Sequence, residues 1–295
     1  MPPLVDCLAI DIGGTKLAVA LVDECGAIRG QLIQPTPRTE DPERLFDALT
    51  EMIDSLRRAP GAQPALVGVG CGGPMELGGR RVSPLNIPAW RNFPLHERLE
   101  AATGLAVVID NDAKALALGE GWCGAAAGRA NYLAMVVSTG VGGGLVVDGR
   151  LLDGRMGNAG HLGHLVVEPG GRRCRCGVRG CLEAEASGSA IEAMTGSPAR
   201  DATPDVVLRT GTMVGRAVAS VVTLLDLDLC VVAGSVALCF GAPFFEAANE
   251  ELRNSTGLDY TAGATIVPAG LGADGPLVGA ARVAFAARER QAVEV

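Results

Sequence analysis

Apolar residues along the chain follow two kinds of pattern. Short continuous apolar runs, most of them ending in glycine or acidic residues, predict buried strands at 4–10, 17–22, 27–34, 66–70, 106–110, 132–137, 145–147, 229–233 and 265–267. Apolar residues three and four positions apart predict helices at 42–58, 113–122, 186–195, 201–209, 212–225, 244–252 and 276–288. Strands that alternate with helices in this way indicate an α/β protein.

One pattern occurs twice: an apolar strand, a glycine-rich turn and a second apolar strand. The first turn follows Asp11, and the second is the segment 138–144. Glycine lets backbone N–H groups point at anionic oxygens and threonine adds a hydroxyl, so both turns are candidate phosphate-binding sites. The nucleotide-binding candidates are Asp11, Gly13, Gly14, Thr15, Lys16, Thr139, Gly140 and Gly142. The repetition predicts two similar lobes that grip the phosphates of a nucleotide from both sides.

Asp11 ends the first strand, where its carboxylate is placed to hold Mg²⁺ through water. The turn after it matches neither the Walker A pattern GxxxxGK[ST] nor the dinucleotide pattern GxGxxG. Taken alone, this turn is equally well interpreted as an ordinary glycine hairpin.

Two of the three histidines and three of the nine cysteines lie within residues 157–183. Three thiolates and one imidazole fill the four positions of a tetrahedral structural zinc site, which makes His164, Cys174, Cys176 and Cys181 the candidate ligands. Free buried cysteines are the alternative, but the crowding of these cysteines among arginines favours zinc. His161 and Glu183 flank the proposed ligands, where a rigid loop would hold them for hydrogen bonds to a substrate.

Asn111 and Asp112 follow the predicted strand at 106–110 and precede a predicted helix. An aspartate at such a junction can simply cap the helix. It can also be the general base of a kinase, because a carboxylate fixed at a strand end can accept the proton of an attacking hydroxyl. Gly73 lies in a further turn, 71–74, where the backbone can approach a ligand.

Composition narrows the class of protein. The chain has 295 residues, a formal net charge of −8, 48% hydrophobic residues and 41 glycines. This length favours two lobes over one, and the acidic balance argues against nucleic acid as a partner. The first residues lack the basic segment of a signal peptide, and no apolar run reaches transmembrane length, so we expect no membrane partner. The odd number of cysteines suits a reducing compartment, and we expect a cytoplasmic protein.

Together these motifs resemble the ROK family of repressors, open reading frames and kinases. The resemblance extends over essentially the whole chain and rests most specifically on Asn111-Asp112, on Gly163-His164 and on Cys174-x-Cys176-Gly177-x2-Gly180-Cys181-x-Glu183. It implies a two-lobed α/β fold of the actin-like ATPase (ribonuclease H-like) type with a structural zinc loop. Residues 1–111 with 280–295 would form a smaller N-terminal lobe, and residues 112–279 a larger lobe that contains the zinc loop.

The resemblance also implies an activity, namely ATP- and Mg²⁺-dependent phosphorylation of the 6-hydroxyl of a hexose by a homodimer or homotetramer. In the family the aspartate of the Asn-Asp pair is the catalytic base, which corresponds to Asp112, and the histidine and three cysteines bind zinc. The implied hexose-binding residues are Gly73, Asn86, Asn111, Asp112, His161, His164 and Glu183. Adenosine would lie against Gly234 and Ser235, although an ordinary βα turn is the alternative there.

His161 departs from the commoner family pattern, Glu-x-Gly-His, whose glutamate contacts sugar hydroxyls near the anomeric end. The His-x-Gly-His form resembles bacterial N-acetylmannosamine kinases and also some glucokinase-like members, and His161 that merely packs beside the zinc loop is the alternative. We expect glucose as the substrate, then N-acetylmannosamine. A sugar-responsive repressor would need a DNA-binding domain before Asp11, and we expect none. An inactive sugar-binding protein is disfavoured because Asp11, Asp112 and both glycine turns are intact.

Overall fold

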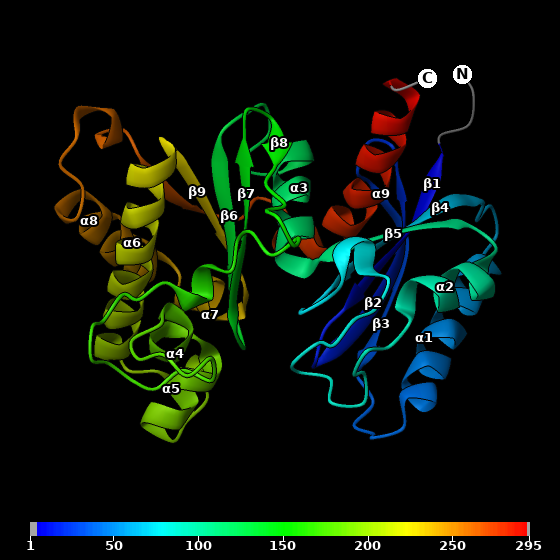
Figure 1. Ribbon diagram of the computed structural model, residues 1–295, viewed down its shortest axis with the longest axis horizontal. Coiled ribbons are helices and arrows are strands. Elements are labelled where there is room, and N and C mark those ends of the chain that lie inside the picture. The colour runs from blue at the N-terminus through cyan, green and yellow to red at the C-terminus, as the bar shows by residue number, and fades with distance from the viewer. Residues whose placement is uncertain (1–4, 294–295) are drawn as a thin grey trace. The chain divides into compact units, whose positions relative to one another are not determined.

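The contacts within the chain divide it into two compact units (Figure 1). The computed structural model describes residues 5–293. Unit 1 comprises the chain up to Gly124, Asp153–Asn158 and the chain from Ala273, and unit 2 comprises Ala125–Leu152 and Ala159–Gly272. The described residues exclude 1–4, 294 and 295, which belong to the predicted smaller lobe. Residue 4 is also the first residue of the first predicted strand.

Unit 1 is built on a five-stranded sheet with the order β3-β2-β1-β4-β5. The strands are β1 (Asp6–Ile12), β2 (Lys16–Asp23), β3 (Ile28–Pro35), β4 (Pro64–Cys71) and β5 (Ala106–Asn111). The first three form an antiparallel meander, whereas β4 runs parallel to β1 and β5 runs parallel to β4. The carboxyl ends of β1, β4 and β5 therefore lie at one edge of this sheet.

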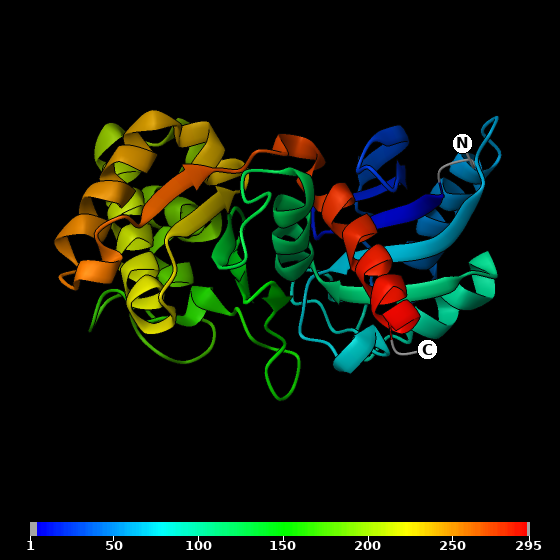
Figure 2. The same ribbon diagram turned by 90° about the horizontal axis from the view of Figure 1, so that it is seen from above.

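Helices cover both faces of this sheet. They are α1 (Pro42–Arg57), α2 (Leu95–Thr103), α3 (Asp112–Cys123) and α9 (Gly275–Val293). Alternate residues of β1 enter two cores: Leu8 and Ile10 pack with α1, and Cys7 and Ala9 pack with α9, which lies along the sheet (Figure 2). The lobe boundary predicted between residues 111 and 112 falls inside unit 1, because α3 packs against α9. Helix α2 has no counterpart among the predicted elements.

Unit 2 repeats the sheet plan of unit 1. Its strands are β6 (Tyr132–Val137), β7 (Val141–Val147), β8 (Arg150–Leu151), β9 (Leu229–Ala233) and β10 (Thr265–Pro268), in the order β10-β9-β6-β7-β8. Antiparallel pairing joins β6, β7 and β8, whereas β9 runs parallel to β6 and β10 runs parallel to β9. The predicted α/β class and the predicted internal repetition are therefore confirmed, and β8 is an addition.

The helices of unit 2 are α4 (Leu182–Ala186), α5 (Gly188–Thr195), α6 (Pro204–Leu225), α7 (Ser235–Phe240) and α8 (Ala242–Asn254). The two helices predicted at 201–209 and 212–225 are one helix, so that prediction was wrong. Gly211 does not interrupt α6 but lets α8 approach, since a Cβ there would lie 2.5 Å from the carbonyl oxygen of Phe244. By length and composition α6 is apolar enough to cross a membrane, but it packs against α8 and α4 in the core.

The second glycine turn is shorter than predicted. Strand β7 begins at Val141, so Gly142, Gly143 and Gly144 lie in the strand, and the turn itself is Ser138–Gly140. A Cβ at Gly143 would lie 2.3 Å from Cδ1 of Leu162. The strand glycines therefore make room for the loop that carries His161, a close approach that the apolar pattern of the sequence does not reveal.

Candidate active site

Asp11 and Asp112 are placed by parallel strands of unit 1. Asp11 in β1 pairs with Gly70 of β4, and Gly70 pairs with Asp110 of β5. Asp112 comes two residues after Asp110 as the first residue of α3. The register therefore brings the predicted general base and the predicted metal-binding carboxylate to the same edge of one sheet.

The two carboxylates influence each other electrostatically. Asp11 is only 7% exposed. Burial, and to a lesser extent the nearby charge of Asp112, raise the pKa of Asp11 to about 7, although the charge of Lys16 opposes both effects. A hard cation would relieve the repulsion between two such carboxylates. Magnesium prefers carboxylate and water oxygens, so the residues present fit the predicted metal.

Asn111 caps the N-terminus of helix α3, and the side chain of Asp112 approaches the same backbone N–H group. Oδ1 of Asn111 accepts a hydrogen bond from the backbone N–H of Ala113 at 3.1 Å, and Oδ1 of Asp112 lies 2.9 Å from the same nitrogen. A Cβ at Gly73 would lie 3.7 Å from Nδ2 of Asn111, and a Cβ at Gly72 would lie 4.0 Å from Oδ2 of Asp112. The structure therefore brings together three predicted substrate residues, Gly73, Asn111 and Asp112.

The first glycine turn is held by a residue that carried no motif. The N–H of Gly13 donates to the carbonyl of Lys16 at 3.0 Å, which closes the turn. Thr36, just after β3, donates from Oγ1 to the carbonyl of Gly13 at 2.6 Å and from its N–H to the carbonyl of Thr15 at 3.1 Å. Thr36 thus fixes the conformation of the predicted phosphate turn, although no spacing in the sequence links it to that turn.

Asn86 lies against the same turn. A Cβ at Gly14 would lie 2.5 Å from Cβ of Asn86, so only glycine permits this approach. The loop that carries Asn86 is organised by Arg91, whose Nη1 donates at 2.8, 3.0 and 2.9 Å to the carbonyls of Pro84, Ile87 and Trp90. Trp90 is wholly buried and donates from Nε1 to the carbonyl of Pro42 at 3.1 Å. Trp90 therefore anchors the loop, and the side chain of Asn86 in this loop is exposed to solvent.

The second turn gathers the predicted residues of unit 2. Oγ of Ser138 lies 2.9 Å from Oγ of Ser235 at the start of α7, directly after Gly234. On the other side, Oε2 of Glu183 accepts a hydrogen bond from the backbone N–H of Val141 at 3.2 Å. The structure brings together Thr139, Gly140, Glu183, Gly234 and Ser235, while Gly142 lies beyond the turn in β7.

The four predicted zinc ligands also converge in unit 2. His164, Cys174, Cys176 and Cys181 each offer one atom, and these atoms lie within 4.8 Å of one another. Sγ of Cys174 lies 3.7 Å from Nδ1 of His164, and Sγ of Cys176 lies 3.6 Å from Sγ of Cys181. Zn–S bonds of about 2.3 Å in a tetrahedron hold sulfurs about 3.8 Å apart, so the donor set fits zinc. The ring of His161 lies 6.2 Å from that of His164, between centroids.

Comparisons with known proteins find relatives that match most of the chain. Residues 7–287 match the family model described as "ROK family". A glucokinase of Thermotoga maritima is 42% identical over 191 residues, which is 64% of this chain and 59% of that protein's length. An N-acetylmannosamine kinase of Citrobacter koseri is 39% identical over 250 residues, 79% of this chain and 84% of that protein. A ROK family glucokinase from Streptomyces griseus, solved in complex with glucose and AMPPNP, is 30% identical with a TM-score of 0.83, over 95% of this chain and 99% of that one.

Proposed function

The chain belongs to the ROK family, and on that premise we propose that it is an ATP- and Mg²⁺-dependent hexose kinase. The observation that carries this proposal is the placement of Asp112 and Asp11 at one edge of the sheet of unit 1. In the reaction the hexose 6-oxygen forms a bond to the γ-phosphorus of ATP, the bond to the β,γ-bridging oxygen breaks, and ADP leaves. Relatives named glucokinase and N-acetylmannosamine kinase support a phosphotransferase with an alcohol acceptor.

Asp112 is the general base. Oδ1 accepts from the N–H of Ala113, which fixes the direction of the carboxylate. The glycines at 72 and 73 carry no side chain that would block a hydroxyl from approaching. Asp112 takes the proton of the 6-hydroxyl as the oxygen attacks, a contribution typically worth two to four orders of magnitude in rate. The rest of the acceleration comes from positioning and from stabilising charge on the phosphoryl group.

Asp11 would hold the magnesium ion through water, and an ion bound there would supply positive charge to offset that of the β- and γ-phosphates. Gly13, Gly14, Thr15 and Lys16 of unit 1, and Thr139, Gly140 and Gly142 of unit 2, bind the phosphates of ATP through N–H, hydroxyl and ammonium groups. Gly234 and Ser235 lie beside the second turn, where adenosine rests against the backbone.

The zinc ion is structural in this proposal, with His164, Cys174, Cys176 and Cys181 as its four ligands. It keeps the flanking residues His161 and Glu183 in place to bind hexose hydroxyls, and His164 also contacts the sugar. Asn86, Gly73 and Asn111 complete the hexose set from unit 1. Glucose is the first substrate that we propose and N-acetylmannosamine is the alternative, because relatives of both kinds match the chain at similar identity.

A coupled ADP-release assay tests the activity. Purified protein with ATP and Mg²⁺ is offered glucose, mannose, N-acetylmannosamine and N-acetylglucosamine in turn, and Asp112→Asn serves as the inactive control. We expect the highest kcat/KM with glucose. Higher kcat/KM with N-acetylmannosamine would select the alternative, and no hexose-dependent ADP release with any sugar would refute the kinase.

Two further features belong to the proposal. We propose a cytoplasmic enzyme that assembles as a homodimer or homotetramer. Light scattering of the purified protein gives the mass of the assembly, and the mass of a single chain would contradict this part of the proposal.

A further inference from the structure

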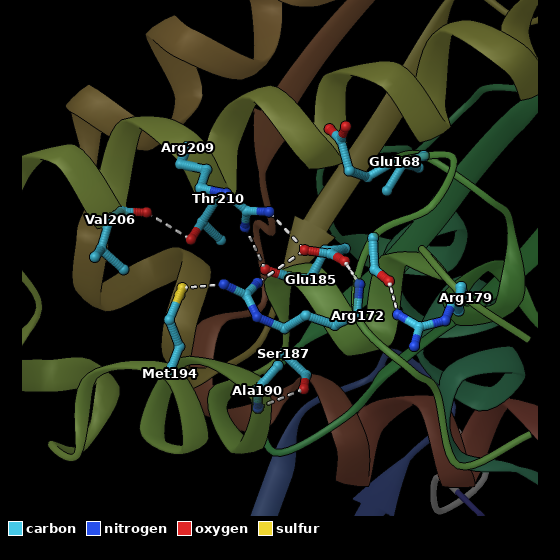
Figure 3. A network of polar contacts seen from close by, with 12 residues as sticks. Glu168, Arg172, Arg179, Glu185, Ser187, Ala190, Met194, Val206, Arg209 and Thr210 are labelled. Carbon is cyan, nitrogen blue, oxygen red and sulfur yellow. Dashed lines mark hydrogen bonds and ion pairs between the residues drawn. The ribbon is translucent and has the colours of Figure 1, made fainter. Parts of the chain in front are cut away.

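Glu185 is a buried carboxylate to which the proposed reaction gives no role. It lies in α4 and is 1% exposed. Figure 3 shows its carboxylate between the guanidinium groups of Arg172, from the loop that carries the cysteines, and Arg209, from α6. A buried carboxylate is retained in a fold only when donors satisfy its oxygens, so this arrangement points to a specific role.

Both oxygens of Glu185 are used. Oε1 accepts the backbone N–H of Arg172 at 2.6 Å, and Oε2 accepts Nη1 of Arg172 at 2.8 Å and Nη2 of Arg209 at 2.5 Å. Nη1 of Arg209 also donates to the backbone carbonyl of Glu185 at 2.9 Å. Residue 171 is glycine at the point of closest approach, because a Cβ there would lie 2.4 Å from Oε1. Charge-assisted hydrogen bonds of this kind are among the strongest polar contacts in proteins.

These contacts fasten the base of the cysteine loop. Arg172 comes two residues before Cys174, and its carbonyl accepts the N–H of Gly180 at 2.8 Å, which pairs the two ends of the loop. Glu185 itself comes four residues after Cys181 and two after Glu183. The carboxylate therefore joins the start of the loop to the helix in which the loop ends, and Arg209 ties both to α6.

We propose that Glu185 is a positioning residue that closes the base of the zinc loop independently of the metal and holds Glu183 in its binding orientation. Zinc would join Cys174 and Cys176, inside the loop, to His164 before it and Cys181 after it, whereas Glu185 joins the start of the loop to the helix that follows it. The part of this inference that concerns hexose binding rests on the proposed function. The part that concerns the loop does not, because it follows from the contacts of Glu185 alone.

The test exploits the loop's own arginines. Arg173, Arg175 and Arg179 are exposed and are substrates for trypsin whenever the loop opens. We compare wild type, Glu185→Gln and Glu192→Gln, the last being an exposed glutamate of the neighbouring helix α5 that serves as the matched control. Each protein is digested before and after treatment with a zinc chelator, and cleavage within 173–179 is followed by mass spectrometry.

Glutamine keeps the shape of Glu185 but loses the charge that holds two guanidinium groups. We expect chelator-treated Glu185→Gln to be cut about tenfold faster in the loop than chelator-treated wild type, and untreated Glu185→Gln to release zinc to a chromogenic chelator about tenfold faster. Glu192→Gln should match wild type in both. If the chelator-treated forms of wild type and Glu185→Gln are cut equally fast, the proposal that Glu185 closes the loop independently of the metal is overturned.

Kinetics separate a positioning role from a merely structural one. Glu185→Gln should raise the KM for hexose about tenfold, raise the KM for ATP by no more than about fivefold through displacement of Glu183, and leave kcat within about twofold, the pattern of lost substrate binding. Equal losses in all three constants would overturn the positioning role. If wild type phosphorylates no hexose, the proposed function fails, while trypsin cleavage still tests whether Glu185 closes the loop.

A second variant covers the case in which Glu185→Gln does not fold. Arg209→Lys keeps a positive charge but cannot bridge the carboxylate and the backbone carbonyl of Glu185 as the planar guanidinium does. After chelator treatment we expect it to be cut faster in the loop than wild type, and we expect a higher KM for hexose than in wild type, each change being smaller than tenfold. If Arg209→Lys behaves like wild type in both measurements, the contact between Arg209 of α6 and Glu185 does not contribute to closing the loop.

Discussion

The carboxylate of Glu183 accepts a hydrogen bond from the backbone N–H of Val141, with 3.2 Å between Oε2 and the nitrogen. A Cβ at Gly140 would lie 2.9 Å from the same oxygen, so the turn and the carboxylate are in close contact. Glu183 belongs to the proposed hexose-binding residues, and Gly140 belongs to the proposed phosphate-binding turn. One side chain of unit 2 therefore belongs to the proposed hexose-binding residues and also contacts the proposed phosphate-binding turn.

We accordingly expect Glu183→Ala to weaken the binding of both substrates. Loss of one hydrogen bond to the turn should raise the KM for ATP about fivefold, in addition to a larger rise in the KM for hexose. Glu183→Gln keeps an oxygen that can accept from Val141, so its KM for ATP should stay near wild type while its KM for hexose rises. Steady-state kinetics of both variants test this prediction. An identical KM for ATP in Glu183→Ala and wild type would show that the hydrogen bond between Glu183 and Val141 does not affect ATP binding.

Asp112→Asn should abolish phosphoryl transfer while leaving hexose binding largely intact. Asparagine keeps the size of the side chain and its hydrogen bond to Ala113 but cannot take a proton, so kcat should fall by about two to four orders of magnitude. Hexose binding is measured separately by calorimetry. A variant with near-normal kcat would show that Asp112 serves the helix terminus alone.

Asn111→Ala provides the matched comparison for that prediction. Asn111 is the residue that caps α3, so its removal should lower the free energy of unfolding by about 1 kcal/mol. Asp112→Asn should change the free energy of unfolding less than Asn111→Ala does. Chemical denaturation of the two variants therefore distinguishes the structural cap from the general base.

Much of the fold could be predicted because its signals are local. Apolar runs set the strands, and the repeated strand–turn–strand pattern appears as two sheets with corresponding strand order. Two of the errors arose where a glycine packs against a residue that is far away in the sequence. Gly211 lies inside α6, where the absence of a side chain lets α8 approach, and Gly143 lies in β7, where it leaves room for Leu162. Neither neighbour is close enough in sequence for periodicity to reveal it.

The candidate site divides in the same way. The cysteines and the Asn-Asp pair are compact motifs, and the structure brings each set together. Thr36, Arg91 and Glu185 were missed because each acts through backbone carbonyls or charges brought close by the tertiary fold. Arg91 had one usable signal, its position directly after the buried Trp90, whereas a threonine after an edge strand has none.

Zinc should be present at one ion per chain. Elemental analysis of protein purified without added metal measures it, and zinc-free protein with full activity would contradict both the site and its role. Cys181→Ser should lower zinc content, thermal stability and activity together, because metal binding and loop folding are one equilibrium. Cys239→Ser is the matched control, since Cys239 is exposed and lies in α7, outside the loop.

The choice of hexose should depend on His161. A carboxylate at this position would accept two hydroxyl hydrogen bonds, whereas a neutral imidazole offers one donor and one acceptor. We therefore expect His161→Glu to change the ratio of kcat/KM for glucose to kcat/KM for N-acetylmannosamine, sugars that differ at carbon 2. The KM for ATP should stay within about twofold of wild type, because a change confined to hexose contacts alters the binding of that substrate alone.

The direction of the change follows from the hydrogen bonds. The hydroxyls of glucose at carbons 1 and 2 can both donate to a carboxylate, whereas N-acetylmannosamine carries an amide in place of the second hydroxyl. His161→Glu should therefore favour glucose, by about tenfold if one charge-assisted hydrogen bond is gained. His161 is exposed and lies beside His164, a position that suits either substrate contact or simple packing. An unchanged ratio between the two sugars would show that His161 only packs against the zinc loop.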